Sequence, residues 1–232
     1  MTSRDRIRKA LNHEEPDRIP RDLGGTESSG ITAYALSSLQ RYLRLHDDMK
    51  VFEPCQYVAH PGAHLKTRFK IDTANLTQEP ANWIRQSNPF GFEVLLPEKW
   101  REETCEDGST IIRSAAGEVA AQRPEGGHYF DAVNPPLRHI ADPLEIEHFR
   151  ETIFSFDCPW FADEPVENLR ERAKAMQQKG ECTIFNLCCH ILAAGQLLRG
   201  YENFMIDLLS DERMVRKLLD CLIEGYCRRL DR

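Results

Sequence analysis

The sequence lacks any uninterrupted apolar run of the roughly 18 residues that a membrane-spanning helix needs. Its first residues are charged and have none of the apolar core that marks a signal peptide. It also lacks an excess of basic residues, since 30 Lys and Arg stand against 37 Asp and Glu, for a net charge of −7. Because phosphate binding needs a basic face, this balance argues against nucleic acid. We therefore expect a cytoplasmic protein with neither a membrane nor a nucleic acid as partner.

Several chemical signatures are missing as well. The eight cysteines include no CxxC pair, so they indicate neither a disulfide framework nor a structural zinc site. We expect most of them to be reduced and partly buried. The sequence has no HExxH motif, and no GxGxxG or Walker loop follows an expected strand. No cofactor is therefore assigned from a motif in this chain.

What the sequence does contain is typical of a folded domain, with 41% hydrophobic and 29% charged residues. A first helix is expected after Thr2 and Asp5, which have the spacing of a capping box, and it ends before Pro16. A short strand is expected over 18–23, and a helix over 32–45. The glycine-rich turn between them completes a βα unit.

Later segments repeat this order less clearly. A helix over 63–69 and a short strand over 71–76 form a second unit. A helix that begins at Pro165 and stops at Gly180 leads into a buried strand over 182–187. The remaining helices are expected over 144–151, 191–198, 201–209 and 212–229.

Short extended runs interrupt this pattern between the second and third units. The turns at Asp107-Gly108 and Gly117 predict a β-meander inserted over about residues 90–123. Two interpretations stay open: the meander is a structural flap, or it is a loop that helps to form the site.

The last expected helix carries a wide apolar stripe, and we expect that stripe to be left uncovered because few elements precede it. The stripe consists of Met214, Val215, Leu218, Leu219, Leu222, Ile223 and Tyr226. Three parallel strands would also leave two open edges. Residues 1–232 are therefore expected to form an α/β fold, the N-terminal portion of a (β/α)₈ barrel with an inserted β-meander, the barrel being incomplete.

In such barrels the chemistry lies at the carboxyl ends of the strands, and this rule selects two places. The first is Asp22 with Gly24, Gly25, Thr26 and Glu27. The glycines allow close approach of the backbone, and the carboxylates and hydroxyl can bind a polar ligand. The alternative is a helix-start turn with ordinary capping residues.

The second place follows the strand over 182–187 and contains Asn186, Cys188, Cys189 and His190. A thiol and an imidazole there can form an activated nucleophile, part of a metal site or a substrate contact. Cys188 and His190 can point together, because residues two apart on an extended segment share a face. The alternative is a buried cysteine, a pocket-lining cysteine and a histidine hydrogen-bonded at the next helix. Two ligands do not make a zinc site, so no metal ligand is assigned.

Several weak motifs occur in a fixed order along the chain. They are a helix followed by Glu15-Pro-Asp-Arg-Ile-Pro20, then Ile71-Asp72, Asn88-Pro-Phe-Gly91, Pro136-Leu137, Asp142-Pro143, Leu198-Arg-Gly-Tyr-Glu202 and Asp207-Leu-Leu-Ser-Asp211. In this order the chain resembles the uroporphyrinogen decarboxylase superfamily. It is closer to the branch of zinc-dependent methyltransferases that act on methylated corrinoid proteins.

The resemblance implies a (β/α)₈ barrel longer than this chain, a small-molecule substrate and, as a possible partner, a corrinoid protein. It also implies zinc and a corrinoid for the complete protein, with the zinc ligands beyond Arg232. True decarboxylases carry an arginine-containing motif after the first strand, whereas this chain has Leu23-Gly-Gly-Thr-Glu27. The missing arginines argue against an acidic porphyrinogen as the substrate.

Three functions are compatible with these residues and motifs. The first is the N-terminal part of a corrinoid-linked methyltransferase, with His190, Cys188 and Glu27 as catalytic residues. Its substrate-binding residues would be Asp22, Gly24, Gly25, Thr26 and Asn186. The second is uroporphyrinogen decarboxylation in porphyrin biosynthesis. The third is a non-catalytic truncated chain or a scaffold that binds a corrinoid or a partner.

Overall fold

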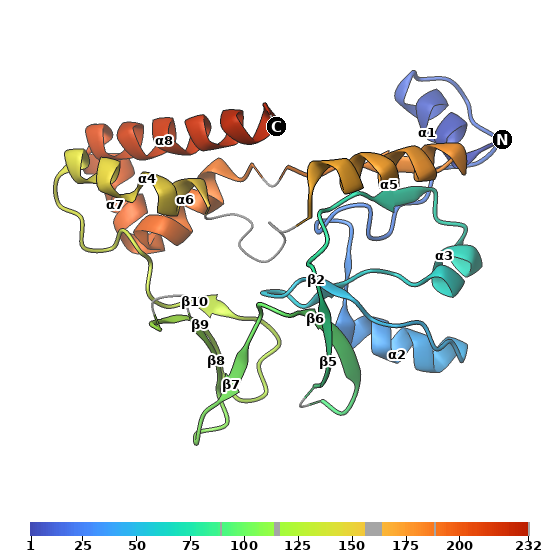
Figure 1. Ribbon diagram of the computed structural model, residues 1–232, viewed down its shortest axis with the longest axis horizontal. Helices are drawn as coiled ribbons and strands as arrows, with labels where there is room; N and C mark the ends of the chain where they lie inside the picture. The colour runs from blue at the N-terminus through green and yellow to red at the C-terminus, as the bar shows by residue number, and fades with distance from the viewer. Residues whose placement is uncertain (89, 114–116, 156–163, 188, 232) are drawn as a thin grey trace. The chain divides into compact units, whose positions relative to one another are not determined.

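Helices and short strands alternate along the chain, and they fall into two units that are described separately (Figure 1). The computed structural model describes residues 1–88, 90–113, 117–155, 164–187 and 189–231. The first unit comprises Met1–Trp100 with Trp160–Asn186, and the second comprises Arg101–Pro159 with Leu187–Arg232. The fold is mixed α/β, and within the described ranges the strands form small sheets with no closed barrel.

The first unit contains four helices and three small sheets. Its helices are α1 (Ser3–Leu11), α2 (Ala33–Leu43), α3 (Ala63–Phe69) and α5 (Val166–Gln178). Its strands are β1 (Ile31–Thr32), β2 (Val51–Glu53), β3 (Val58–Ala59), β4 (Thr73–Asn75), β5 (Trp83–Ser87), β6 (Glu93–Pro97) and β11 (Cys182–Ile184). β1, β3 and β2 form an antiparallel sheet, β5 pairs with β6, and β4 pairs with β11.

The pairing of β4 with β11 is parallel and aligns Thr73 with Cys182 and Asn75 with Ile184. Paired residues point to the same side of a sheet, and successive residues along a strand point to opposite sides. Thr73, Asn75, Cys182 and Ile184 therefore share one face. Helix α5 lies on the other face, where the Thr183 hydroxyl contacts Met176 Sδ at 4.0 Å. This is the arrangement of a βαβ crossover.

A buried carboxylate joins the N-terminal region to β4. Asp72, whose side chain is fully buried, accepts hydrogen bonds from Arg6 (2.5 Å), Arg18 (2.7 and 2.9 Å) and Ser3 (2.9 Å). It also accepts the backbone N–H of Arg21 at 2.9 Å, while its own N–H donates to Arg21 O at 2.8 Å. The expected strand over 18–23 thus lies beside β4 but is not a regular strand. Pro20 has no N–H to donate, and a side chain takes the Arg21 N–H.

A β-meander is present, but its boundaries were predicted incorrectly. The first strand within the predicted range of 90–123 is β6, which forms a hairpin of the first unit with β5. The meander proper lies in the second unit, in the order β10-β9-β8-β7, and it includes a strand that the sequence did not predict. Its strands are β7 (Glu102–Thr104), β8 (Thr110–Arg113), β9 (Val119–Arg123) and β10 (Asp131–Ala132). The Asp107-Gly108 turn is confirmed, with Gly108 at φ 77°.

Helices make up the rest of the second unit. A 3₁₀ helix, η1 (Pro143–Phe149), leads into α4 (Arg150–Phe154), and later come α6 (Ile191–Arg199), α7 (Tyr201–Ser210) and α8 (Glu212–Leu230). Buried Arg199 pairs with Asp207 at 2.7 Å and donates to Leu137 O at 2.8 Å, which ties α6 and α7 to the segment before η1. In the described part of the chain, no helix is both long and apolar enough to span a membrane.

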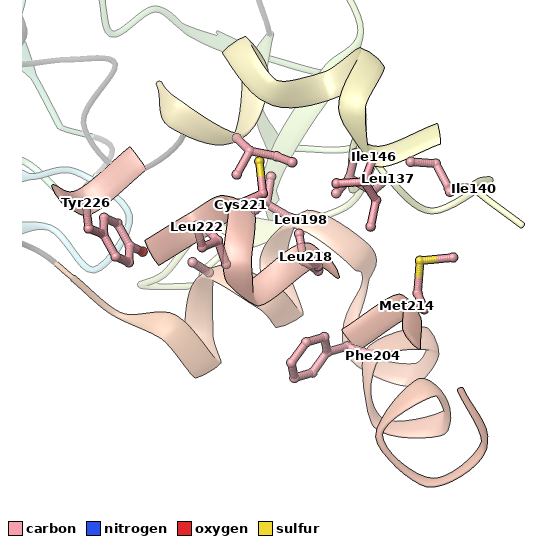
Figure 2. Close-up of a cluster of buried hydrophobic side chains, with 12 residues drawn as sticks. Leu137, Ile140, Ile146, Leu198, Phe204, Met214, Leu218, Cys221, Leu222 and Tyr226 are labelled. Atoms are coloured by element: carbon pink, nitrogen blue, oxygen red, sulfur yellow. The ribbon is translucent and has the colours of Figure 1, made fainter. Parts of the chain in front are cut away.

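The apolar stripe of α8 is covered, so the expectation that it stays uncovered is wrong. Figure 2 shows Leu218, Cys221 and Leu222 of α8 gathered with Leu198 and Ile146 in one buried cluster. Elements η1, α4, α6 and α7 surround this face. The sequence count missed this because η1 and α4 are short and their apolar residues are few. Ile223 alone of the predicted stripe is exposed, at 44%.

We predict that Asp72→Asn lowers the free energy of unfolding by about 3–5 kcal/mol at neutral pH, because it leaves two arginines without their buried partner. Burial raises the pKa of Asp72, but hydrogen bonds from Arg18, the Arg21 N–H, Ser3 and Arg6 outweigh it and lower the pKa to about 2. The ordinary pKa is about 3.9. The stabilisation is therefore complete above about pH 4 and is lost as pH falls towards about 2. Urea unfolding at several pH values measures both effects.

Asp17→Asn is the matched control, because Asp17 also pairs with Arg6 but is half exposed. We expect it to cost much less than Asp72→Asn, because solvent screens an exposed ion pair. An Asp72→Asn variant that is as stable as its parent at pH 7 would contradict the structural role of this carboxylate.

Candidate functional site

The loop of residues 22–30 is closed on itself by backbone hydrogen bonds. Gly24 N donates to Ser29 O at 2.8 Å, and Gly30 N donates to Glu27 O at 3.0 Å. Thr26 N donates to the Ser29 hydroxyl at 3.1 Å. Gly24 has φ 75°, a backbone conformation that favours glycine. The small and hydroxylated residues of this segment therefore build a compact turn whose residues are fixed in place.

Gly25 brings this loop against the inner face of β4 and β11, the face opposite α5. A Cβ atom at Gly25 would lie 2.6 Å from Asp22 Oδ1, 2.9 Å from Ile184 Cδ1 and 3.0 Å from Thr73 Cβ. Any larger residue would push the loop off the strands. The glycine is thus required by close packing and not by an unusual φ.

Asp22 is held at the same place by two hydrogen bonds to one of its oxygens. Thr73 Oγ1 donates to Asp22 Oδ1 at 2.5 Å, and Gly25 N donates to it at 3.0 Å. The predicted site residues Asp22, Gly24, Gly25 and Thr26 therefore lie together beside β4. One oxygen of Asp22 maintains the loop, and Asp22 as a whole is exposed.

Asn186 and Glu27 meet across this loop. The Asn186 amide Nδ2 donates to Glu27 Oε2, which joins the segment after β11 to the loop. Asn186 stands two residues beyond Ile184. The structure therefore places two predicted residues, distant in sequence, in direct contact at the carboxyl end of β11.

Asn75 was not predicted as a site residue, although it is the last residue of β4 and pairs with Ile184 of β11. It is 9% exposed. Its Oδ1 accepts the Thr77 N–H at 2.6 Å, whereas its Nδ2 has no hydrogen-bond partner among the described residues. The rule that selected Asp22 and Asn186, a polar side chain at a strand's carboxyl end, could also have selected Asn75.

Glu53 adds a carboxylate from the neighbouring sheet. It ends β2 opposite Val58, and Val58 Cγ1 occupies the space that a Cβ atom at Gly30 would need, so β3 abuts the loop. Glu53 accepts the N–H groups of Cys55 (2.9 Å) and Gln56 (2.7 Å). Burial raises the pKa of Glu53 despite these bonds, and the negative charge of Glu27 raises it further.

A pocket of about 540 Å³ opens beside this loop. Ile7, Leu11, Ile184 and Phe185 give it apolar walls, and Arg21, Asp22 and Thr73 give it a polar side. Mostly apolar walls with a few fixed polar groups are typical of small-molecule sites.

The residues of the second predicted place do not all belong to one unit: Asn186 lies in the first unit and His190 in the second. Cys188 lies outside the described residues. His190, exposed, precedes α6 in the second unit, whereas the loop with Glu27 belongs to the first. Arg229 of α8 donates to Leu187 O at 3.2 Å, which anchors the start of this segment. The catalytic roles of His190 and Cys188 therefore stay predictions from sequence.

The zinc that the resemblance implies finds no ligand set in the described part of the chain. No three His, Cys, Asp or Glu side chains there are grouped so that they could hold a metal ion. The described residues therefore do not form such a site.

The comparisons with known proteins found no family model, no curated protein and no solved structure that matches the chain. The function is therefore inferred from the geometry at the strand ends and from the resemblance of the sequence motifs.

We predict that Gly25→Ala destabilises the first unit by about 1–3 kcal/mol, because the added methyl group overlaps Asp22, Thr73 and Ile184. Denaturant unfolding measures the change. In an Ile184→Val background, which removes the contacting Cδ1 atom, the same substitution should cost clearly less. An equal cost in both backgrounds would show that the loop does not rest on Ile184.

Proposed function

We propose that this chain supplies the first part of a (β/α)₈-barrel enzyme of the uroporphyrinogen decarboxylase superfamily, and that the enzyme is a corrinoid-linked methyltransferase. The site would lie where segment 18–23, β4 and β11 end. The observation that carries this proposal is that one loop contacts both strands: its Asp22 is hydrogen-bonded to Thr73 of β4, and its Glu27 to Asn186, just beyond the carboxyl end of β11. Ligands of parallel α/β folds bind at this edge.

The partial barrel is supported by the order of the elements. Two parallel strands in register, with α5 on one face and a polar loop on the other, are what the beginning of such a barrel contains. The inserted meander would then be an excursion between the second and third strands. The motifs from Glu15-Pro-Asp-Arg-Ile-Pro20 onwards favour the methyltransferase branch.

The charges at the loop argue against the decarboxylase alternative. A porphyrinogen carries carboxylates that need arginines or lysines. At the corresponding position this chain has Glu27, next to Asp22, and Glu53 adds to the negative charge. These groups would repel an acidic substrate.

The described residues would bind and orient the substrate. Glu27, fixed by Asn186, would accept a hydrogen bond from it, and the pocket beside Asp22 would hold its apolar part. Fixing a reactant in this way can supply a large part of a rate enhancement without any proton transfer. His190 and Cys188 would act later in the reaction, in the roles that the sequence predicts.

The test uses the protein expressed from its uninterrupted reading frame. Methyl transfer from methylcobalamin to 2-mercaptoethanol is followed by the visible absorbance of the corrinoid. We expect transfer, a reduction of kcat by about 100-fold in His190→Ala, and a similar loss of kcat/KM in Asn186→Ala. His64→Ala is the control, since the His64 side chain is exposed and pairs with Asp47.

Other outcomes would overturn the proposal. Tight binding of a porphyrin tetracarboxylate without methyl transfer would favour the decarboxylase. An absence of both activities would favour a non-catalytic scaffold. Unchanged kcat and KM in His190→Ala would remove that residue from the site.

A further inference from the structure

A single oxygen atom joins strand β4 to the loop of residues 22–30. Thr73 lies in β4 and is 8% exposed, and its hydroxyl donates to Asp22 Oδ1 at 2.5 Å. The same oxygen accepts the Gly25 N–H at 3.0 Å. A hydrogen bond from a hydroxyl group to a carboxylate is assisted by the negative charge and is among the stronger ones in proteins. The buried hydroxyl therefore fixes the carboxylate, and the carboxylate fixes the start of the loop.

The packing around Gly25 leaves this junction no room to adjust. Gly25 is buried, and a Cβ atom there would lie 2.6 Å from Asp22 Oδ1 and 3.0 Å from Thr73 Cβ. Closely packed groups have low compressibility, so they pass a displacement on to their neighbours. A shift of the Asp22 carboxylate would therefore move the backbone at Gly25.

The rest of the loop is braced internally, so that it moves as a unit. The Gly24 N–H donates to Ser29 O at 2.8 Å, and the Gly30 N–H donates to Glu27 O at 3.0 Å. The Thr26 N–H donates to the Ser29 hydroxyl at 3.1 Å. These bonds tie Glu27 to the first residues of the loop. A displacement at the start of the loop is therefore carried to Glu27.

Glu27 is the far end of this connection. Its Oε2 accepts a hydrogen bond from Asn186 Nδ2, just beyond β11. In the proposed function it also accepts one from the substrate. Hydrogen bonds weaken steeply when their geometry is disturbed, and a reactant misplaced by about 1 Å can react about 100-fold more slowly. The position of a hydroxyl group on β4 thus bears on a contact that is made beyond β11.

We propose that Thr73 is a positioning residue, which acts through Asp22 and the loop to set where Glu27 meets Asn186 and the substrate. Asp22, selected from the sequence as a substrate-binding residue, is the intermediate in this connection, because its Oδ1 takes both hydrogen bonds. The inference rests on the proposed function for the contact between Glu27 and the substrate.

The test follows the side-chain amide signals of Asn186 by ¹H–¹⁵N NMR and requires no turnover. Thr73→Val keeps the shape of the side chain but removes the hydroxyl group, so the signals should shift. Thr73→Ser restores the donor, and the signals should return to their parental positions. Thr110→Val is the matched control, because Thr110 is also buried and its hydroxyl accepts a hydrogen bond from Arg123 in the second unit. It should leave the Asn186 signals unchanged.

Two substitutions of Asp22 test the same connection at an exposed position, and they decide the question should Thr73→Val fail to fold. Asp22→Ala removes both acceptor bonds and should shift the Asn186 signals as Thr73→Val does. Asp22→Asn keeps an oxygen that can accept both bonds, and it should leave the signals close to those of the parent. A carboxylate that acted through its charge would give the same shift in both variants.

Steady-state kinetics of methyl transfer supply a second readout. Thr73→Val should raise KM by about tenfold and leave kcat within about twofold of the parent, because it weakens a substrate contact and removes no reacting group. Thr73→Ser should restore KM. A hydroxyl group with a merely structural role would affect stability and leave KM unchanged.

Asn186 signals that stay in place in both Thr73→Val and Asp22→Ala would overturn the inference. A shift that Thr73→Ser does not reverse, equal shifts in Asp22→Ala and Asp22→Asn, or an unchanged KM in Thr73→Val would do the same. The NMR result is separate from the methyl-transfer assay. A response of Asn186 without methyl transfer would contradict only the proposed function, and methyl transfer without that response would contradict only this inference.

Discussion

The buried carboxylate of Asp72 is the interaction on which the first unit depends. A buried carboxylate is tolerated only when it is paired and hydrogen-bonded, and Asp72 meets this requirement by drawing in Arg6, Arg18 and Ser3. Helix α1 and segment 18–23 are thereby fixed to β4. Because Asp72 and Arg21 also exchange hydrogen bonds, the next residues, Asp22 and Thr73, come to lie side by side. The position of the candidate site thus follows from an ion pair outside it.

Local signals in the sequence predicted the helices well. Helix α3 runs from Ala63 to Phe69 as expected, and Thr2 caps α1, because capping residues and apolar spacing act within one or two turns. Strand partners were less predictable. The run at 92–96 is a strand, yet it pairs with β5 and not with the meander, since pairing depends on contacts between distant segments. The cover over the apolar face of α8 was missed because it is built from distant segments, of which η1 and α4 are short and carry few apolar residues.

The candidate site was partly visible in the sequence. The rule about carboxyl ends of strands selected Asp22, Gly25, Glu27 and Asn186, and the structure places all four around one loop. Asn75 was missed although the same rule could have selected it, whereas nothing in the sequence context of Glu53 distinguishes it from ordinary polar residues. The burial of Asn75 and the negative charge near Glu53 are visible only in the folded chain.

The two faces of the β4–β11 pair differ in a way that bears on function. Parallel strands are usually apolar on both faces, because helices or a core cover both. Here α5 covers one face, but the other carries Thr73 and Asn75 and meets a polar loop. The polar half of that face contributes little hydrophobic stabilisation, and the Asn75 amide, which lacks a partner for Nδ2 among the described residues, weakens it further. Because the Asp72 network holds the strands in place from outside, the inner face can keep polar groups at some expense of stability.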